Sequence, residues 1–377
     1  MKRFLQKWLW KRREKETTND LPGRLLRKLA PKRTRFAAVD IGTREIKMVE
    51  ISATGGKTEV TAFCRVPAPV GELGEAVYEE ALVNALCDMV LSSGIQTKEV
   101  ITTIGGNKTI TRHIHVPALP DRELEATVRL EAEKFIPAAV GELTIRYLKL
   151  GETNRAGERY LHLLLVAAPT TVVYDYYGVF TRAGLIIAAI DLEAFSLWRV
   201  FGGLEPSTAI LDIGASKTQL VVVRDGVLQF TRTIPAGGDL LTRSLAEHYG
   251  LTFQEAQRVK EEEGELLGKE DATISSTAAM QVDFSLRYGL SGLIREIRRS
   301  LDFYATQYNA AAIERFIISG GTSKLKGFRE FFAEAMETPV DSGAPGIYGL
   351  PEYREEAVSY DPTCAVVLGT ALREVAG

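Results

Sequence analysis

The chain has 377 residues, 45% of them hydrophobic and 25% charged, which is typical of a soluble globular protein with two or more domains. Its three cysteines, Cys64, Cys87 and Cys364, are scattered and form no C-x-x-C pair. This argues for a reducing compartment and against disulfides or structural zinc. No run reaches the ~20 apolar residues that cross a bilayer, so we expect no membrane-spanning helix.

The net charge of -3 hides a strongly basic amino-terminal tail. Residues 1–35 carry 13 Lys and Arg against 3 acidic residues, a local charge of +10, so the other 342 residues carry -13. Apolar residues recur there at helical spacing: Phe4, Leu5, Trp8 and Leu9. The pattern is typical of a basic amphipathic helix on an anionic membrane surface. A solvated leader and a nucleic-acid contact are the alternatives. We expect residues 1–30 to contact a membrane or a protein, and expect no nucleic acid.

The first part of the folded chain reads as strands followed by a helix and a strand. We expect three strands within 36–66, with turns at Gly42-Thr43 and Gly55-Gly56, then a helix over 75–93 and a strand over 100–104.

Residues 109–188 then read as an insertion with the order strand, helix, strand, strand, helix. The expected strands are 113–116, 144–150 and 160–166, and the expected helices are 121–136 and 170–183. His113 and His115 share a strand face and could hold a metal ion. No Cys or carboxylate lies at ligand spacing, so we favour two polar residues on an exposed face.

The second half repeats the strand pattern and then becomes mostly helical. We expect strands at 209–211, 219–223, 227–234 and 315–318, and helices at 240–249, 253–263, 275–308 and 326–336. An apolar stripe along the long helix, assigned to the core, comprises Leu290, Ile294, Ile297 and Leu301.

The same three letters stand at Asp40-Ile41-Gly42 and Asp212-Ile213-Gly214, each closing one strand and opening another. Glycine lets backbone N–H groups approach phosphate oxygens, and a hydroxyl after it adds a donor. The carboxylate is repelled by phosphate and is suited to holding Mg²⁺ through water. A third glycine turn, Ser319 to Ser323, would let a base or ribose lie against backbone. The two matching turns therefore predict a phosphate chain between them.

The three glycine turns resemble, in order and spacing, the nucleotide-binding segments of the actin-like ATP-binding superfamily. The phosphate-1 segment would be Asp40 to Thr43, the phosphate-2 segment Asp212 to Gly214 and the adenosine segment Ile318 to Thr322. Within this superfamily, Val128 to Pro137 and Asp191 to Phe195 resemble the PilM family of type IV pilus assembly proteins, relatives of the division protein FtsA. The resemblance implies an α/β, two-lobed actin-like fold of duplicated RNase H-like domains with an inserted SHS2-type subdomain IC.

The resemblance also implies a division into subdomains. These are a basic amphipathic tail (1–35), subdomain IA (36–108, completed by 189–207), the inserted subdomain IC (109–188), subdomain IIA (208–250 and 309–377) and a mostly helical subdomain IIB (251–308).

ATP and Mg²⁺ are the cofactors that the resemblance implies. Asp40 and Asp212 would hold Mg²⁺ through water. The phosphate contacts would be Gly42, Thr43, Gly214 and Thr218; the adenosine border would be Lys260, Gly320, Gly321, Thr322 and Ser323; Lys47, Ser216, Gly237 and Gly238 complete the nucleotide-binding set. Glu193 falls near the residue that positions the attacking water in actin-like proteins, and a helix cap is the alternative role.

Two departures from the superfamily pattern bear on turnover. The second turn reads Ala215-Ser216-Lys217 where hydrolytic relatives have a Gly-Gly-Thr run, and Gln257 stands where several relatives have Glu. Hydrolysis needs a positioned water and Mg²⁺, whereas binding needs neither to be placed so closely. We expect ATP binding with at most slow ATPase activity, and whether ATP is hydrolysed stays open.

The favoured function is a cytoplasmic ATP-binding scaffold of type IV pilus assembly, peripheral at the inner face of the cell membrane. By resemblance, the groove between IA and IC docks the amino-terminal peptide of a PilN-like inner-membrane protein, and nucleotide state tunes partner affinity. Other pilus assembly components and further copies of the chain are additional candidate partners.

Two alternatives come from other functional classes. An FtsA-like membrane-tethered division filament protein would carry its membrane helix at the carboxyl terminus, whereas the candidate here is amino-terminal. A metabolite kinase of the same superfamily would need a substrate pocket with its own base, whereas residues 109–188 read as a compact domain.

Overall fold

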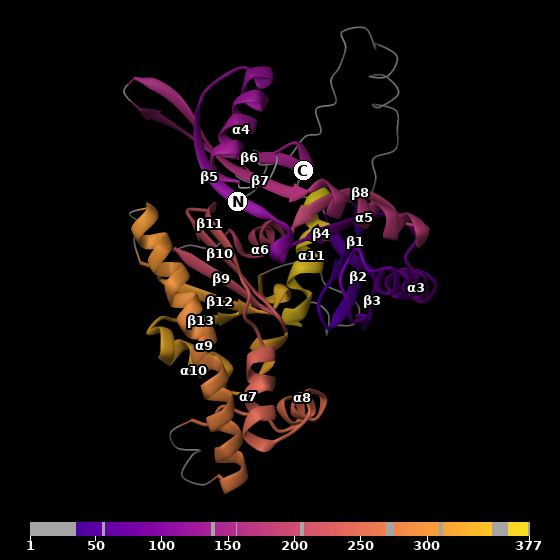
Figure 1. The fold of residues 1–377 in the computed structure, drawn as a ribbon, viewed down its shortest axis with the longest axis vertical. Coiled ribbons are helices and arrows are strands. Elements are labelled where there is room, and N and C mark those ends of the chain that lie inside the picture. Colours follow the sequence, from indigo (N-terminus) through magenta and orange to yellow (C-terminus); the bar gives the residue numbers. More distant parts are fainter. Residues whose placement is uncertain are drawn as a thin grey trace.

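The computed structural model describes residues 35–54, 57–136, 140–155, 157–203, 207–268, 275–308, 312–348 and 361–375 (Figure 1). The basic tail and its expected amphipathic helix lie outside these residues. Among the described helices, none combines the length and the apolar character that a membrane span needs.

Two five-stranded sheets share one strand order and one set of strand directions. The first has the order β3-β2-β1-β4-β8, and the second has the order β11-β10-β9-β12-β13. In each, the first three strands along the chain pair antiparallel and the last two add in parallel. The strands are β1 (Arg35–Ile41), β2 (Glu45–Thr54), β3 (Lys57–Pro67), β4 (Glu99–Ile104), β8 (Ile186–Leu192), β9 (Thr208–Ile213), β10 (Thr218–Arg224), β11 (Val227–Ile234), β12 (Arg315–Ser319) and β13 (Val340–Ser342). The duplicated turn of the sequence is therefore the β1-β2 turn in one sheet and the β9-β10 turn in the other.

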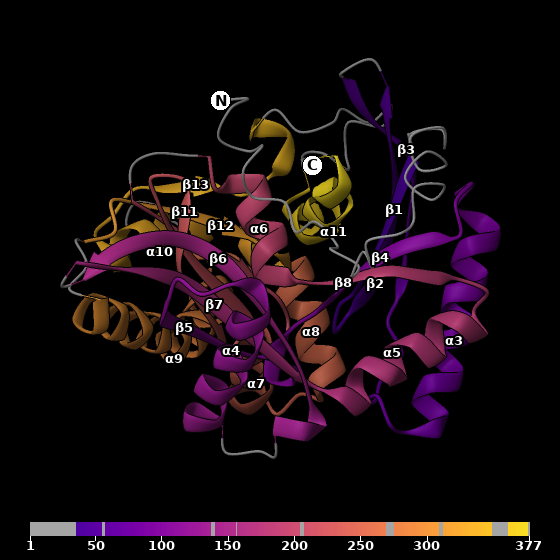
Figure 2. The same ribbon diagram turned by 90° about the horizontal axis from the view of Figure 1, so that it is seen from above.

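Two short helices, α6 (Glu193–Phe201) and α11 (Ala365–Ala371), lie between the sheets (Figure 2). Every residue of α11 is buried, and Val367, Leu368 and Ala371 pack against β1 and β2. The two helices cross closely, because a Cβ on Gly369 would lie 2.2 Å from the Ser196 carbonyl oxygen. One core cluster thus joins residues of both lobes, including Phe201 of α6 and Val221 of β10. The β1-β2 and β9-β10 turns, which we call the phosphate turns, connect strands that contribute to this cluster. On the outer face, α3 (Ala76–Ser92) and α5 (Thr170–Arg182) cover the first sheet.

The insertion between β4 and α5 forms a separate three-stranded antiparallel sheet with the order β5-β7-β6. It comprises β5 (Ile110–Pro117), α4 (Asp121–Phe135), β6 (Leu143–Arg155) and β7 (Glu158–Pro169). The helix α4 has its own buried apolar face against this sheet, through Leu124, Val128 and Ala132. The first inserted strand, β5, is an edge strand, and its far side faces the second lobe (Figure 1).

The second lobe adds α7 (Asp239–Tyr249), α8 (Phe253–Glu262), α9 (Thr277–Tyr308) and α10 (Phe328–Met336). Three of the four expected stripe residues on α9, Leu290, Ile294 and Ile297, are buried, and Leu301 packs against the same core. The helix α8 begins with a capping box between Thr252 and Glu255.

The expectation of two polar histidines on an exposed face is correct for His115 and wrong for His113. His113 lies under the end of α9, with its ring 5.6 Å from that of Tyr308, and its Nε2 is buried without a partner. Its Nδ1 lies 2.9 Å from His162 Nε2, and His162 stacks on His115. Burial and the two neighbouring imidazoles lower the pKa of His113 to about 3. Sequence spacing missed His162 because it comes from β7, across the sheet.

Candidate functional site

The two phosphate turns meet across the gap between the lobes. In both, the glycine N–H donates to a carbonyl three residues on, from Gly42 to Glu45 at 3.0 Å and from Gly214 to Lys217 at 3.0 Å. The hydroxyl oxygens of Thr43 and Ser216 lie 2.8 Å apart, and both side chains are exposed. The turns predicted from the repeated letters are therefore brought together, with hydroxyls available between them.

Three carboxyl groups gather behind the turns: Asp40 from β1, Asp212 from β9 and Glu193 from the start of α6. Desolvation raises the pKa of Asp40, and the facing Lys47 opposes this. Desolvation, Glu193 and Asp40 together raise the pKa of Asp212 to about 7. Concentrated negative charge of this kind favours a divalent cation. Within the described residues no cluster of three or more His, Cys, Asp or Glu has metal-holding geometry.

Two lysines offset that charge. Lys47 pairs with Asp40 across the β1-β2 hairpin, and Asp40 and Glu45 raise its pKa despite burial. Lys217 lies at the end of the second turn, and its Nζ donates to Glu193 Oε1 at 2.6 Å. Burial lowers the pKa of Lys217, but Glu193, Asp40 and Asp212 together raise it above its usual value. Of the two, only Lys47 was among the expected nucleotide contacts.

Glu193 is the first residue of α6, directly after β8, and it is buried. Its carboxyl group lies flat against Gly105, where a Cβ would come within 2.3 Å of the Glu193 carboxyl carbon. The alternative role of helix cap is wrong, since Leu192 is the N-cap residue and no side-chain cap hydrogen bond forms. The carboxylate instead accepts a hydrogen bond from Lys217 of the other lobe.

The loop Gly237-Gly238 packs against the second turn. The Gly238 N–H donates to Gly214 O at 2.9 Å, and the Asp239 N–H donates to Ala215 O at 2.8 Å. A Cβ on Gly237 would lie 2.6 Å from the Gly214 and Ala215 carbonyl oxygens, so this close approach needs glycine. The loop places the amino terminus of α7, which attracts anions, at the site.

The third glycine turn touches the same backbone. Gly320 has a φ of +83°, and a Cβ there would lie 2.6 Å from Ile213 O. Thr322 Oγ1 donates to Gly214 O at 3.0 Å, while Ser323 Oγ donates to Gly320 O at 2.7 Å. Gly321 is exposed, and no atom would obstruct a Cβ on it. Open backbone at this position suits a flat ligand group.

Lys260 of α8 reaches the Gly237-Gly238 loop from its far side. Its Nζ lies 3.2 Å from Gly238 O, 2.8 Å from Thr242 Oγ1 and 2.9 Å from Gln257 Oε1. Burial lowers the pKa of Lys260 to about 8.

Thr218 differs from the other expected contacts because its buried hydroxyl donates to Ala236 O at 2.7 Å. It holds the loop in place.

Arg44 is a site residue that sequence reasoning missed. It follows the first turn, and its guanidinium donates to Asp239 Oδ1 of the second lobe at 2.6 Å. The same group lies 5.2 Å above the ring of Phe253. The only signal in the sequence is a cation directly after Asp-Ile-Gly-Thr, and its partner is 195 residues away.

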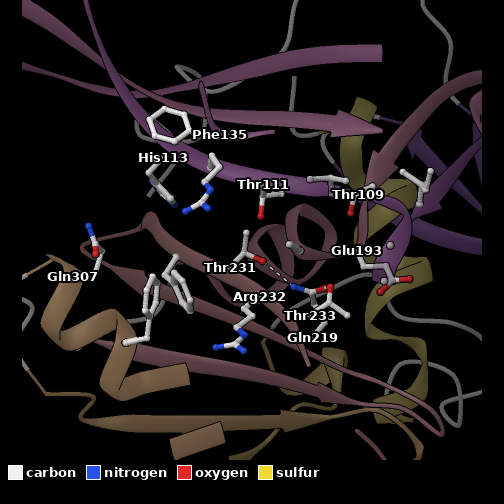
Figure 3. Close-up of a pocket in the computed structure, with 18 of the residues that line it drawn as sticks. Thr109, Thr111, His113, Phe135, Glu193, Gln219, Thr231, Arg232, Thr233 and Gln307 are labelled. Carbon is white, nitrogen blue, oxygen red and sulfur yellow. Dashed lines mark hydrogen bonds between the residues drawn. The ribbon is translucent and has the colours of Figure 1, made fainter. Parts of the chain in front are cut away.

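A groove of about 820 Å³ runs beside the site, between the inserted subdomain and the second lobe (Figure 3). One wall is the edge strand β5, the other is the edge strand β11 with the end of α9, and Glu193 lies at one end. We refer to it as the edge-strand groove; its lining includes Thr109, Thr111, Phe135, Thr231, Thr233, Phe303 and Tyr308. The groove expected from the resemblance lies between IA and IC and stays a prediction; the edge-strand groove has one wall from the second lobe instead.

The family model described as "Type IV pilus assembly protein PilM" matches residues 38–374. The chain is 22% identical over 363 residues to the cell division protein FtsA of Bacillus subtilis, a match that covers 84% of this chain and 81% of the relative.

Among solved structures, the PilM-PilN type IV pilus biogenesis complex is similar at a TM-score of 0.78 and 25% identity, covering 92% of this chain and 99% of the other. MreB5 of Spiroplasma citri bound to AMPPNP shares the fold at a TM-score of 0.50 and 13% identity, over 90% of this chain and 96% of the other. The fold is thus the two-lobed actin-like ATP-binding fold that the sequence predicted. The family match spans nearly the whole chain, which therefore belongs to the PilM family of type IV pilus assembly proteins.

Proposed function

We propose that the chain is an ATP-binding scaffold of type IV pilus assembly that docks the extended amino-terminal peptide of a PilN-like inner-membrane protein. The observation that carries this proposal is the edge-strand groove, which lies directly beside the phosphate turns. The similarity to the solved PilM-PilN complex supports the same partner class.

The groove offers an extended peptide what it needs to bind. Within the sheets that the structure describes, the edge strands β5 and β11 each pair with a neighbour on one side only, so backbone N–H and C=O groups on the other side can pair with an added strand. Exposed aromatic rings, including Phe135 at 48% and Phe303 at 46%, offer apolar contact for peptide side chains. Threonine hydroxyls between them supply further hydrogen bonds.

The nucleotide site is suited to Mg²⁺-ATP. Asp40 and Asp212 would hold Mg²⁺ through water, the hydroxyls of Thr43 and Ser216 would donate to phosphate, and the loops at 237–238 and 320–323 would border the adenosine. The bound Mg²⁺ would offset phosphate charge. The chain's own residues would orient the phosphates between the lobes, and we expect slow turnover at most.

Nucleotide state and partner binding are coupled through the lobes in this proposal. The two phosphate turns belong to different lobes, and so do the two walls of the groove. A ligand that bridges the turns favours one angle between the lobes, and the same angle sets the width of the groove.

Residues 1–30 would hold the scaffold at the inner face of the cell membrane, which would place it at the cytoplasmic end of its partner. The expected test is liposome binding that depends on anionic lipid and is lost when Trp8 and Trp10 are replaced by Ala.

The docking proposal is tested with a fluorescent peptide that matches the amino terminus of a co-encoded pilus membrane protein. We expect Phe303→Asp, in the groove wall, to weaken binding by about tenfold or more, because a buried charge replaces an apolar contact. The matched control is Tyr288→Asp, which lies on the same helix, is 62% exposed and is absent from the groove lining. Equal peptide affinity of the wild type and both variants, together with phosphorylation of a small metabolite or assembly into filaments, would contradict the scaffold proposal.

A further inference from the structure

Lys217 joins the two lobes at the far end of the second phosphate turn. Its backbone belongs to the second lobe, and its Nζ donates to Glu193 of the first lobe at 2.6 Å. The end of its side chain lies against Gly106, where a Cβ would be 3.6 Å from Nζ. An ammonium group therefore stands at the lobe boundary, hydrogen-bonded to Glu193 and attracted also by Asp40 and Asp212.

Lys260 lies beyond the Gly237-Gly238 loop, which packs against the start of the same turn. It contacts Gly238 O and Thr242 Oγ1, on the side where Thr322 donates to Gly214. The turn is thus flanked by two lysines, one beside the adenosine-side loop and one beside the three carboxyl groups. A nucleotide that extends along the turn from the adenosine-side loop places its phosphate end toward Lys217.

We propose that Lys217 is the residue with which this chain distinguishes ATP from ADP. This inference rests on the proposed nucleotide site and deepens it. The terminal phosphate of ATP adds an anion that competes with Glu193 for the Lys217 ammonium, whereas ADP leaves the Lys217-Glu193 pair in place. Lysine suits such an exchange because its compact charge rotates on a flexible stem and can move between anions.

The exchange also reaches the edge-strand groove. Glu193 lines that groove and at the same time accepts the hydrogen bond from Lys217. Its carboxyl group cannot move far, because Gly105 lies directly behind it. When Lys217 turns to a phosphate, the end of the groove gains an uncompensated negative charge. Lys217 thereby couples binding of the terminal phosphate to the charge at the end of the edge-strand groove.

The test measures the affinity of the full chain for Mg²⁺-ADP and for the non-hydrolysable ATP analogue AMPPNP, by competition with a fluorescent nucleotide. The quantity of interest is the ratio of the two affinities. Lys217→Met should lower the preference for the triphosphate by about tenfold, because it loses a charge-assisted contact and leaves Glu193 facing the phosphate. Glu193→Gln should raise that preference, since Lys217 no longer has a carboxylate to leave.

Lys260→Met is the matched control, because it removes the lysine beside the adenosine-side loop. It should weaken both nucleotides by the same factor and leave the ratio unchanged. Opposite shifts of the ratio in Lys217→Met and Glu193→Gln support the inference, and a pair with a merely structural role would lower both affinities together. An unchanged ratio in both variants, with wild-type binding intact, overturns this inference alone. Failure of the wild-type chain to bind either nucleotide overturns the proposed nucleotide site as well.

Discussion

Each phosphate turn sends a cation into the opposite lobe, yet the two cations meet different surroundings. Arg44 follows the first turn and pairs with Asp239, and its side chain is 44% exposed. Lys217 follows the second turn, its side chain is 29% exposed, and its partner Glu193 is 10% exposed, against 17% for Asp239. The duplicated fold thus carries two reciprocal cross-lobe ion pairs, and the Lys217-Glu193 pair is the more buried of the two. An exposed pair contributes little stability, whereas breaking a buried pair leaves a charge without its partner.

The largest expected effect separates the two aspartates. Asp212→Asn should weaken Mg²⁺-ATP binding by about 100-fold or more, because the cation loses one of two carboxylates. The same change should stabilise the ligand-free chain above pH 7. The raised pKa of Asp212 means that folding at that pH forces charge onto a desolvated group, and this penalty grows as the pH rises from the unfolded-state pKa to the folded-state pKa.

Calorimetric titration and thermal unfolding at pH 8 check this pair of outcomes. Asp40→Asn is the comparison, and it should lose binding while gaining less stability than Asp212→Asn, because Lys47 is the main group that opposes the raised pKa of Asp40. Identical behaviour of the two variants would contradict the asymmetry.

The next effect compares the two cross-lobe cations directly. Lys217→Met should destabilise the ligand-free chain by about 2 kcal/mol, because the Glu193 carboxylate loses its hydrogen-bonded partner. Arg44→Met should cost under about 1 kcal/mol. Urea unfolding of both variants provides the measurement, and an Arg44 effect equal to or larger than that of Lys217 would reverse the ranking.

The glycines of the two turns also differ in the room around them. A Cβ on Gly42 would lie 2.8 Å from Glu45 O, whereas one on Gly214 would lie 3.2 Å from Lys217 O. Gly42→Ala should therefore cost about 1 to 2 kcal/mol of unfolding free energy and Gly214→Ala roughly half of that. Equal costs in urea unfolding would show that the turns relax alike.

Salt gives the smallest effect. In 1 M NaCl the stability difference between wild type and Arg44→Met should fall by a few tenths of a kcal/mol, because exposed charges are screened. The difference between wild type and Lys217→Met should change less, since its partner is buried. If salt also removed the loss of stability caused by Lys217→Met, the Lys217-Glu193 pair would be as screened as the Arg44-Asp239 pair.

The sequence predicted the features that are local or repeated. Both phosphate turns, the third glycine turn and most strands follow from short apolar runs bounded by glycine, and the structure has strands or turns at these places. Among the described α-helices and strands, α6, β13 and α11 were missed. The last is apolar all round because it is buried all round, so it lacks the 3.6-residue period by which a surface helix is recognised.

The candidate site was predictable only as far as its residues lie on those turns. The role of Arg44 depends on its partner Asp239, 195 residues away, and that of Lys217 on Glu193, 24 residues away. The second wall of the edge-strand groove depends on how the inserted sheet faces β11, and no periodicity reports such a relation. Tertiary packing decides these contacts, and a single sequence carries little trace of it.

The long helix α9 connects the edge-strand groove to the far end of the second lobe. Its carboxyl end, at Phe303 and Tyr308, forms part of the groove wall, and its other end projects to the far tip of the second lobe (Figure 1). Its 32 residues span about 48 Å at ~1.5 Å per residue. Pivoting by about 10° at the groove would carry the tip by roughly 8 Å over such a length. A small rotation of α9 at the groove would thus give a larger displacement at Met280, and a fluorescent label at that position could report it.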